Sequence, residues 1–298
     1  MVDAQSFCMI DLSIRHILFP FDFSHQGHIV APYVMAFAER FGARVTVLSV
    51  APPAYEAVPA GMGAALHSGE HSADWKRALK CRLDRELVGQ FATVEVERVT
   101  DCGDAAMRIE DFAHNSDVDL IMMPTHGLGM FRTMLSGSVT SKVLHDVRCP
   151  VWTAAHADAQ HTPILPRSIL CALDATTEGV PLLQHAALFS KRVGATLSVL
   201  HVVEPVSDWP SLARERALQE EMRDTASRAV ESMLECAGVQ ARTRIVVGGI
   251  VPRAAESARE ENADMVIVGR GALREPFRWA RTHAFGIIEQ SPCPVLSV

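Results

Sequence analysis

Short apolar runs alternate with amphipathic stretches along the whole chain. The apolar runs have the length of buried strands, and between them apolar residues recur at helical spacing, as Trp75, Leu79 and Leu83 do at intervals of four. The first half of the chain is therefore predicted to contain strands at 14–21, 44–50, 93–99, 120–123 and 151–153, with helices at 26–41, 74–88, 105–114 and 138–146 between them.

The helix at 26–41 carries signals at both ends. Ser24 is a suitable N-cap, because its hydroxyl can accept a hydrogen bond from a free N–H of the first turn. Gly42 suits the left-handed conformation that commonly ends a helix. Residues 51–71, by contrast, are rich in Pro, Gly and Ala and show no period. They are predicted to form a long loop, either a surface loop or a lid over a ligand.

The second half of the chain repeats the first. Residues 16–24 resemble residues 168–176, and both runs place an aspartate after the strand, Asp22 and Asp174. The apolar strand that follows is repeated at the same offset, and a Cys-Pro-Val sequence ends both copies. Short strands that alternate with helices predict a parallel sheet covered on both faces. The fold class is therefore α/β, with two tandem doubly wound domains of five parallel strands each.

The repeat sets the domain boundaries. Residues 1–155 are predicted to form the first domain and residues 167–298 the second, joined by a linker at 156–166 that lacks periodicity. The last strands, 151–153 and 295–298, are apolar edges, and exposed apolar edges tend to pair. We expect the two copies to pack about a pseudo-twofold axis through these strands, as an intramolecular pseudo-dimer. A further homodimer of two chains stays open.

Composition and charge narrow the class of function. A chain of 298 residues suits two domains, and 48% hydrophobic with 21% charged residues is typical of a soluble globular protein. The net charge of −7, without basic runs, argues against nucleic acid as a partner. No apolar stretch is long enough to span a membrane, and we find no signal peptide. The seven cysteines are scattered and form no CxxC pair, which indicates free thiols in the cytoplasm.

Candidate chemistry lies where ligands bind in such sheets, beyond the carboxyl ends of the strands. Asp22 could accept hydrogen bonds from ribose hydroxyls or an adenine amine, or it could complete an Asp-x-Ser turn that caps the next helix. Gly127 and Gly129 follow the fourth strand, where glycine lets the backbone approach a ligand closely. The run 137–140, Gly-Ser-Val-Thr, opens a helix, whose free N–H groups suit phosphate. No catalytic residue or metal site is predicted.

These pieces together resemble a known family. Gly127, nine further residues and then Gly137-Ser138, placed between a buried strand and a helix, resemble the phosphate loop of the universal stress protein family. The strand at 17–24 and the ending Cys149-Pro150-Val151 are also similar to that family. Because both copies share these features, nearly the whole chain resembles a tandem universal stress protein.

The resemblance implies a Rossmann-like domain of the adenine nucleotide alpha hydrolase type that binds ATP or AMP, with or without Mg, in a subset of members. It implies nucleotide-binding positions at Asp22, Val50, Met123, Pro124, His126, Gly127, Gly137, Ser138, Val139 and Thr140. One position departs from the family pattern, because Pro124 replaces its first glycine. Proline has no N–H, so a backbone contact from this residue would be lost.

The second copy has a degenerate loop. It offers a second site at Asp174, Val202, Gly269 and Gly271, but Arg281-Thr282 stands where the first copy has Gly137-Ser138. An arginine there would fill the space for phosphate. The arginines of this region, Arg270, Arg278 and Arg281, either bind an anion through their side chains or form a solvated basic surface.

The sequence therefore predicts a regulatory protein that binds ATP or AMP mainly in its first domain and acts on protein partners that the sequence does not identify. Two alternatives stay open. One is a ligand-free interaction module, which Pro124 and the degenerate second copy favour. The other is a slow ATPase, in which Ser138 and Thr140 would hold the metal side and His126 is the one candidate base.

Overall fold

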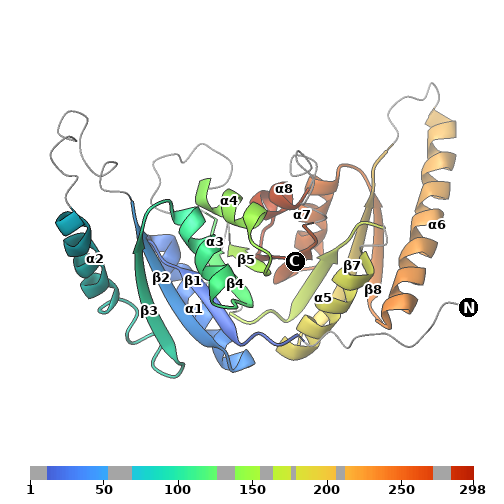
Figure 1. Cartoon of the computed structure of the whole chain (residues 1–298). Coiled ribbons are helices and arrows are strands. Elements are labelled where there is room, and N and C mark those ends of the chain that lie inside the picture. Colours follow the sequence, from blue (N-terminus) through green and yellow to red (C-terminus); the bar gives the residue numbers. More distant parts are fainter. Residues whose placement is uncertain are drawn as a thin grey trace, which may run out of the picture.

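Ten strands form one continuous sheet that runs through the whole molecule (Figure 1). The computed structural model describes residues 12–52, 69–125, 138–154, 164–175, 179–205, 212–270 and 283–298. The strand order is β3-β2-β1-β4-β5-β10-β9-β6-β7-β8, which reads as one five-stranded order followed by its mirror sequence. The α/β fold class and the tandem arrangement are confirmed.

The described residues of the first half of the chain form five strands and four helices. Its strands are β1 (His16–Pro20), β2 (Arg44–Ala51), β3 (Val96–Cys102), β4 (Leu120–Pro124) and β5 (Val151–Ala154). Its helices are α1 (His25–Phe41), α2 (Gly69–Leu83), α3 (Ala105–Asn115) and α4 (Ser138–Asp146).

The second half repeats this order. Its strands are β6 (Ser168–Ala172), β7 (Thr196–Val203), β8 (Arg242–Val247), β9 (Met265–Val268) and β10 (Val295–Ser297). Its helices are α5 (Gly179–Val193), α6 (Leu212–Ala237), α7 (Ile250–Glu260) and α8 (Ala284–Gln290). Figure 1 shows α2 and α6 at opposite ends of the sheet and the C-terminus near its centre.

The two halves join through β5 and β10, which pair antiparallel while the other paired strands of the sheet run parallel. Trp152 faces Leu296 in this pairing, Val151 faces Ser297, and Thr153 faces Val295. Exchanging the equivalent residues of the two copies leaves this register unchanged, as an isologous interface requires. The pairing of the last strands expected from the sequence is confirmed, and the local pseudo-twofold axis passes through the Trp152–Leu296 pair.

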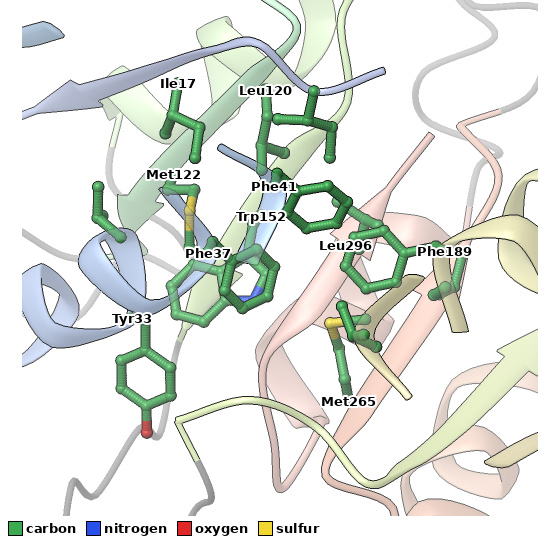
Figure 2. Close-up of a cluster of buried hydrophobic side chains, with 14 of the residues drawn as sticks. Ile17, Tyr33, Phe37, Phe41, Leu120, Met122, Trp152, Phe189, Met265 and Leu296 are labelled. Atoms are coloured by element: carbon green, nitrogen blue, oxygen red, sulfur yellow. The ribbon is translucent and has the colours of Figure 1, made fainter. Parts of the chain in front are cut away.

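An aromatic cluster covers the join on one face of the sheet (Figure 2). Phe37 of α1 lies 5.9 Å from Phe189 of α5, ring centre to ring centre, and Phe41 lies 5.7 Å from the same ring. Trp152 packs against Phe37 at 6.3 Å and against Tyr33 at 5.2 Å. Its side chain is 1% exposed. Because large aromatic side chains bury much apolar area, this cluster holds the two halves together as one body.

The helices divide between the two faces as doubly wound topology requires. Residues of α1, α2, α5 and α6 share one buried apolar cluster, and residues of α3, α4, α7 and α8 share a second on the opposite face. Both clusters run through the two halves without interruption. The sheet is therefore buried on both sides, which accounts for strands that read as continuous apolar runs.

One carboxylate in each copy fixes the start of the first strand. Asp119 accepts hydrogen bonds from the backbone N–H groups of Arg15 and His16, at 2.8 and 2.9 Å. Asp264 does the same in the second copy, accepting from the N–H groups that begin β6. These aspartates lie at the amino ends of β4 and β9, at the edge of the sheet away from the candidate site, so their role is structural.

The predicted caps of α1 are confirmed, but the next two elements are shifted. Ser24 accepts a hydrogen bond from the N–H of Gly27, and Gly42 ends the helix at φ 69°. The helix predicted at 74–88 was wrong at both ends, because α2 begins at Gly69 and ends at Leu83. Leu87 is buried from a turn in which its φ is 59°, so its apolar spacing did not extend the helix.

The strand predicted at 93–99 is displaced toward the carboxyl end. β3 runs from Val96 to Cys102, in register with β2 from Val45 to Ala51. Strand pairing therefore decided the boundaries, and the local apolar pattern did not. Most of the predicted loop at 51–71 and most of the predicted linker lie outside the described residues.

Two further features of the described chain bear on its class. None of its described helices combines the length and apolar character needed to cross a membrane. Six cysteines are described, and all six are free thiols. Burial raises the pKa of Cys171 to about 12, so this thiol stays protonated and behaves as a small apolar side chain.

His185 of α5 generates a prediction for the pH dependence of stability. Its Nε2 atom is buried without a described hydrogen-bond partner, and burial lowers its pKa from 6.5 to about 4. The unfolded chain therefore binds a proton before the folded chain does. We expect the free energy of unfolding to fall as pH drops from about 6.5 to about 4, by on the order of 3 kcal/mol from this residue.

Urea unfolding of His185→Tyr across this pH range provides the test. The variant introduces tyrosine because Tyr33 stands at the equivalent position of α1. The variant should lose less stability than the wild type between pH 6.5 and 4. His114→Tyr, at an exposed position of α3, is the matched control and should follow the wild type. Equal pH slopes for His185→Tyr and the wild type would contradict the assignment.

Candidate functional site

The strand order reverses between β1 and β4, and four predicted site residues lie at the carboxyl ends of β1, β2 and β4. Asp22 comes two residues after β1, and Val50 lies next to the last residue of β2. Met123 and Pro124 end β4. The sheet pairs these strands side by side in the order β2-β1-β4, so the structure brings these residues to one edge, at the topological switch point where such folds bind ligands. His126, Gly127, Gly137 and Gly271 lie outside the described residues.

Asp22 forms the turn that the sequence raised as an alternative to ligand binding. Its Oδ1 accepts a hydrogen bond from the N–H of Ser24 at 3.0 Å, while the Ser24 hydroxyl accepts from the N–H of Gly27 at 3.0 Å. The aspartate is half-buried. One carboxylate oxygen therefore orients the side chain at the start of α1.

Phe23 separates Asp22 from Ser24 in a left-handed backbone conformation, with φ 60°. A bulky residue rarely adopts this conformation, and the surrounding packing has to hold it there. Its ring lies 5.0 Å from the ring of Phe21, and the Arg82 guanidinium lies 3.9 Å above it. The Phe21 ring and the Arg82 guanidinium of α2 therefore hold the sharp turn that places Asp22 at the edge of the sheet.

Thr140 ties the first turn of α4 to the end of β4. Its side chain is 3% exposed, and its hydroxyl lies 3.2 Å from the carbonyl oxygens of both Pro124 and Thr125. A hydroxyl carries one proton, so this donor is committed to the backbone of β4. Thr140 therefore positions the helix, and any contact it makes with a phosphate has to come from its backbone N–H.

The other predicted residues of this region also offer main chain more than side chain. Val50, Met123 and Val139 turn their side chains into the apolar core on the α4 face of the sheet. Ser138 is the first residue of α4. The first N–H groups of a helix have no partner within the helix and carry the positive end of its dipole. The start of α4 is thus equipped to bind an anion through backbone donors.

A contact that the sequence did not predict braces α4 from the side. Asp104 caps α3 by accepting from the N–H of Met107 at 3.0 Å, and Lys142 of α4 donates to its other oxygen at 3.1 Å. These hydrogen bonds lower the pKa of Asp104. Both side chains are about half exposed, so the pair orients α4 more than it stabilises the fold. The sequence signal that could have predicted this cap was the Gly103-Asp104 pair directly before α3.

In the second copy, Asp174, Val202 and Gly269 lie at the corresponding strand ends. For Arg270, however, both predictions were wrong. Its side chain does not lie on a solvated surface, and it does not point toward an anion. Its side chain is buried, and its guanidinium donates to backbone carbonyls at the carboxyl end of α4 in the first copy. Arg278 and Arg281 lie outside the described residues.

The Thr140 contact predicts a stability effect. Thr140→Val removes the buried hydroxyl that donates to the backbone at the end of β4, so the free energy of unfolding should fall by about 1–3 kcal/mol. Thr140→Ser keeps the hydroxyl and should lose less. Urea unfolding measures both variants. A Thr140→Val protein as stable as Thr140→Ser would show that the hydroxyl does not hold α4.

Comparisons with known proteins give the family. The model of the universal stress protein family matches residues 13–154 and again residues 166–298. A universal stress protein of Thermus aquaticus, named for the QAH/OAS sulfhydrylase 3′ region, is 30% identical over 143 residues, which are 46% of this chain and 96% of that protein.

Solved structures share the whole fold. The crystal structure of a universal stress protein from Archaeoglobus fulgidus is 22% identical, covers 96% of this chain and 97% of its own, and superposes with a TM-score of 0.68. A protein of unknown function from Pseudomonas aeruginosa PAO1 is 16% identical, with coverages of 96% and 93% and a TM-score of 0.62. The chain therefore belongs to the universal stress protein family, whose domain it contains twice in tandem.

Proposed function

We propose that this protein is a regulatory protein that binds ATP or AMP in its first domain. The observation that carries the proposal is the convergence of Asp22, the end of β4 and the start of α4 at the switch point between β1 and β4. A carboxylate suits ribose hydroxyls or the adenine amine, and the free N–H groups of a helix start suit phosphate. The spacing of Gly127 and Gly137-Ser138 along the sequence supports the same assignment.

In this proposal the first domain, residues 1–155, holds the nucleotide through ten positions, and the second domain, residues 167–298, has a structural or regulatory role. The ten positions are Asp22, Val50, Met123, Pro124, His126, Gly127, Gly137, Ser138, Val139 and Thr140. A metal such as Mg would accompany the phosphates, and the free cysteines agree with a cytoplasmic setting.

Regulation fits the site better than turnover. Phosphoryl transfer needs a held metal and a positioned water or hydroxyl. The hydroxyl of Thr140 is committed to β4, and the backbone donors of α4 bind an anion without activating a nucleophile. We therefore assign the nucleotide the role of a ligand that selects a conformation of the protein and hence its partners.

Calorimetric titration with ATP and AMP tests the proposal. Asp22→Asn keeps an oxygen for the Ser24 N–H but loses the charge, and its affinity should fall about tenfold. Gly137→Glu places a carboxylate where phosphate is expected and should abolish binding. Ser24→Ala is the matched control, because it weakens the α1 cap and leaves the carboxylate in place. No binding by the wild type, or equal binding by Gly137→Glu, would refute the site.

A ligand-free interaction module is the second candidate. Two observations favour it, since Pro124 offers no N–H to a ligand and the Thr140 hydroxyl is already occupied. The two candidates differ in what the purified protein carries. Denaturing the protein and analysing the released small molecules by mass spectrometry should yield adenine nucleotide at up to one equivalent per chain if the first domain binds it tightly. A nucleotide-free protein that also fails in the titration would establish the interaction module.

A further inference from the structure

Arg270 is a buried cation that reaches from one domain into the other. Its side chain is 7% exposed, and it follows β9 of the second domain. Its guanidinium donates to four backbone carbonyls at the end of α4 and in the turn before β5: Leu144 at 3.1 Å, Val147 at 3.0 Å, Arg148 at 3.5 Å and Cys149 at 2.7 Å. The part of the chain that the structure describes places no Asp or Glu within salt-bridge distance of it.

The carboxyl end of α4 therefore supplies the counter-charge. The last carbonyls of a helix have no intrahelical partner, and they carry the negative end of the helix dipole. A planar guanidinium can satisfy several of them at once, which an ammonium group cannot do with the same geometry. A buried charge without partners would be strongly unfavourable, so these contacts fix both the arginine and the helix end.

The contact is not repeated across the pseudo-twofold axis. Thr125 is the equivalent of Arg270, because its N–H donates to Ala154 at the end of β5 as that of Arg270 donates to Val298 at the end of β10. The side chain of Thr125 donates to the same Ala154 carbonyl of its own domain. The second domain thus holds α4 of the first domain, whereas α8 ends in a turn in which Ser291 bonds to Cys293 of its own domain.

Both ends of α4 are consequently anchored to different domains. Thr140 joins its first turn to β4 of the first domain, and Arg270 joins its last turn to β9 of the second. The helix has nine residues, a span of about 13 Å, over which it moves as a rigid rod. The main chain of Arg270 is fixed in turn to Val298, beside the strand pair that joins the domains.

We propose that Arg270 couples the two domains through α4, so that the position of the phosphate-binding end of this helix depends on the second domain, and nucleotide bound there is sensed by β9 and β10. The nucleotide half of this inference rests on the function proposed above, and the coupling along α4 does not. Arg270 is a positioning residue, since it touches the helix and no ligand.

Hydrogen–deuterium exchange of the full chain without nucleotide tests the coupling itself. Arg270→Met keeps most of the length of the side chain and removes its hydrogen-bond donors. Arg270→Lys keeps the positive charge but loses the planar set of guanidinium donors. Both should raise exchange at least tenfold at the end of α4 and also at its first turns and in β4, near the Thr140 contact. Arg259→Met is the control, because Arg259 donates to the Gln290 carbonyl at the end of α8 within the second domain.

Faster exchange confined to residues 144–149 in both Arg270 variants would overturn the coupling, whether or not a nucleotide binds, since a merely local cap would give that result. If Arg270→Met does not fold, Arg270→Lys decides the same question. In Thr140→Val, the additional effect of Arg270→Lys on exchange at the first turn should be smaller than in the wild type, because the transmitting contact is already lost.

ATP provides the second readout. In the wild type it should slow exchange in β9 and β10 as well as in the first domain. In Arg270→Lys, ATP should bind with an affinity three- to tenfold lower and should slow exchange in the first domain less than in the wild type. It should no longer slow exchange in β9 and β10. Unchanged affinity and unchanged distant protection would overturn the nucleotide half of the inference. Failure of ATP and AMP to bind the wild type would refute the proposed function, and the exchange without nucleotide would still decide the coupling.

Discussion

The antiparallel pair formed by β5 and β10 is the contact on which the rest of the molecule depends. The two strands are short, four and three residues, and their backbone hydrogen bonds alone would hold two domains only weakly. Burial supplies the remainder. Trp152 and Leu296 meet at the local axis, and the rings of Phe37, Phe41 and Phe189 cover them on one face. The pairing also removes an apolar edge from each sheet, which would otherwise recruit other chains.

Joining both copies in one chain frees equivalent positions to differ. In a dimer of identical domains every interface contact occurs twice with its partners exchanged, so a side chain that suits one half has to suit the other. Here Tyr33 and His185 stand at equivalent positions of α1 and α5, and Thr125 and Arg270 after β4 and β9. A single arginine can therefore hold one helix without a like charge opposite it. The two domains therefore differ in these side chains, although their folds are alike.

The sequence predicted the repeat, the fold class and the order of elements, because apolar periodicity and the equivalence of the two aspartates after the first strands are local signals. The caps Ser24 and Gly42 were also local, and they were predicted correctly. The boundaries of α2 and β3 were not, since Leu87 is buried from a left-handed turn and the register of β3 is set by β2. Arg270 was misassigned because its partners lie more than 120 positions away in the chain.

A phosphate site built from main-chain donors is indicated in a sequence by the positions of its glycines more than by polar side chains. Val139 packs into the core and the Thr140 hydroxyl bonds to β4, so the chemistry of these side chains says little about a ligand. What matters is that the backbone can come close, and glycine is the residue that permits this. The substitution of Gly137-Ser138 by Arg281-Thr282 is therefore more informative than the loss of any hydroxyl. Under the proposed function, the second domain lacks this close approach to phosphate, while it has the same fold and contacts α4 through Arg270.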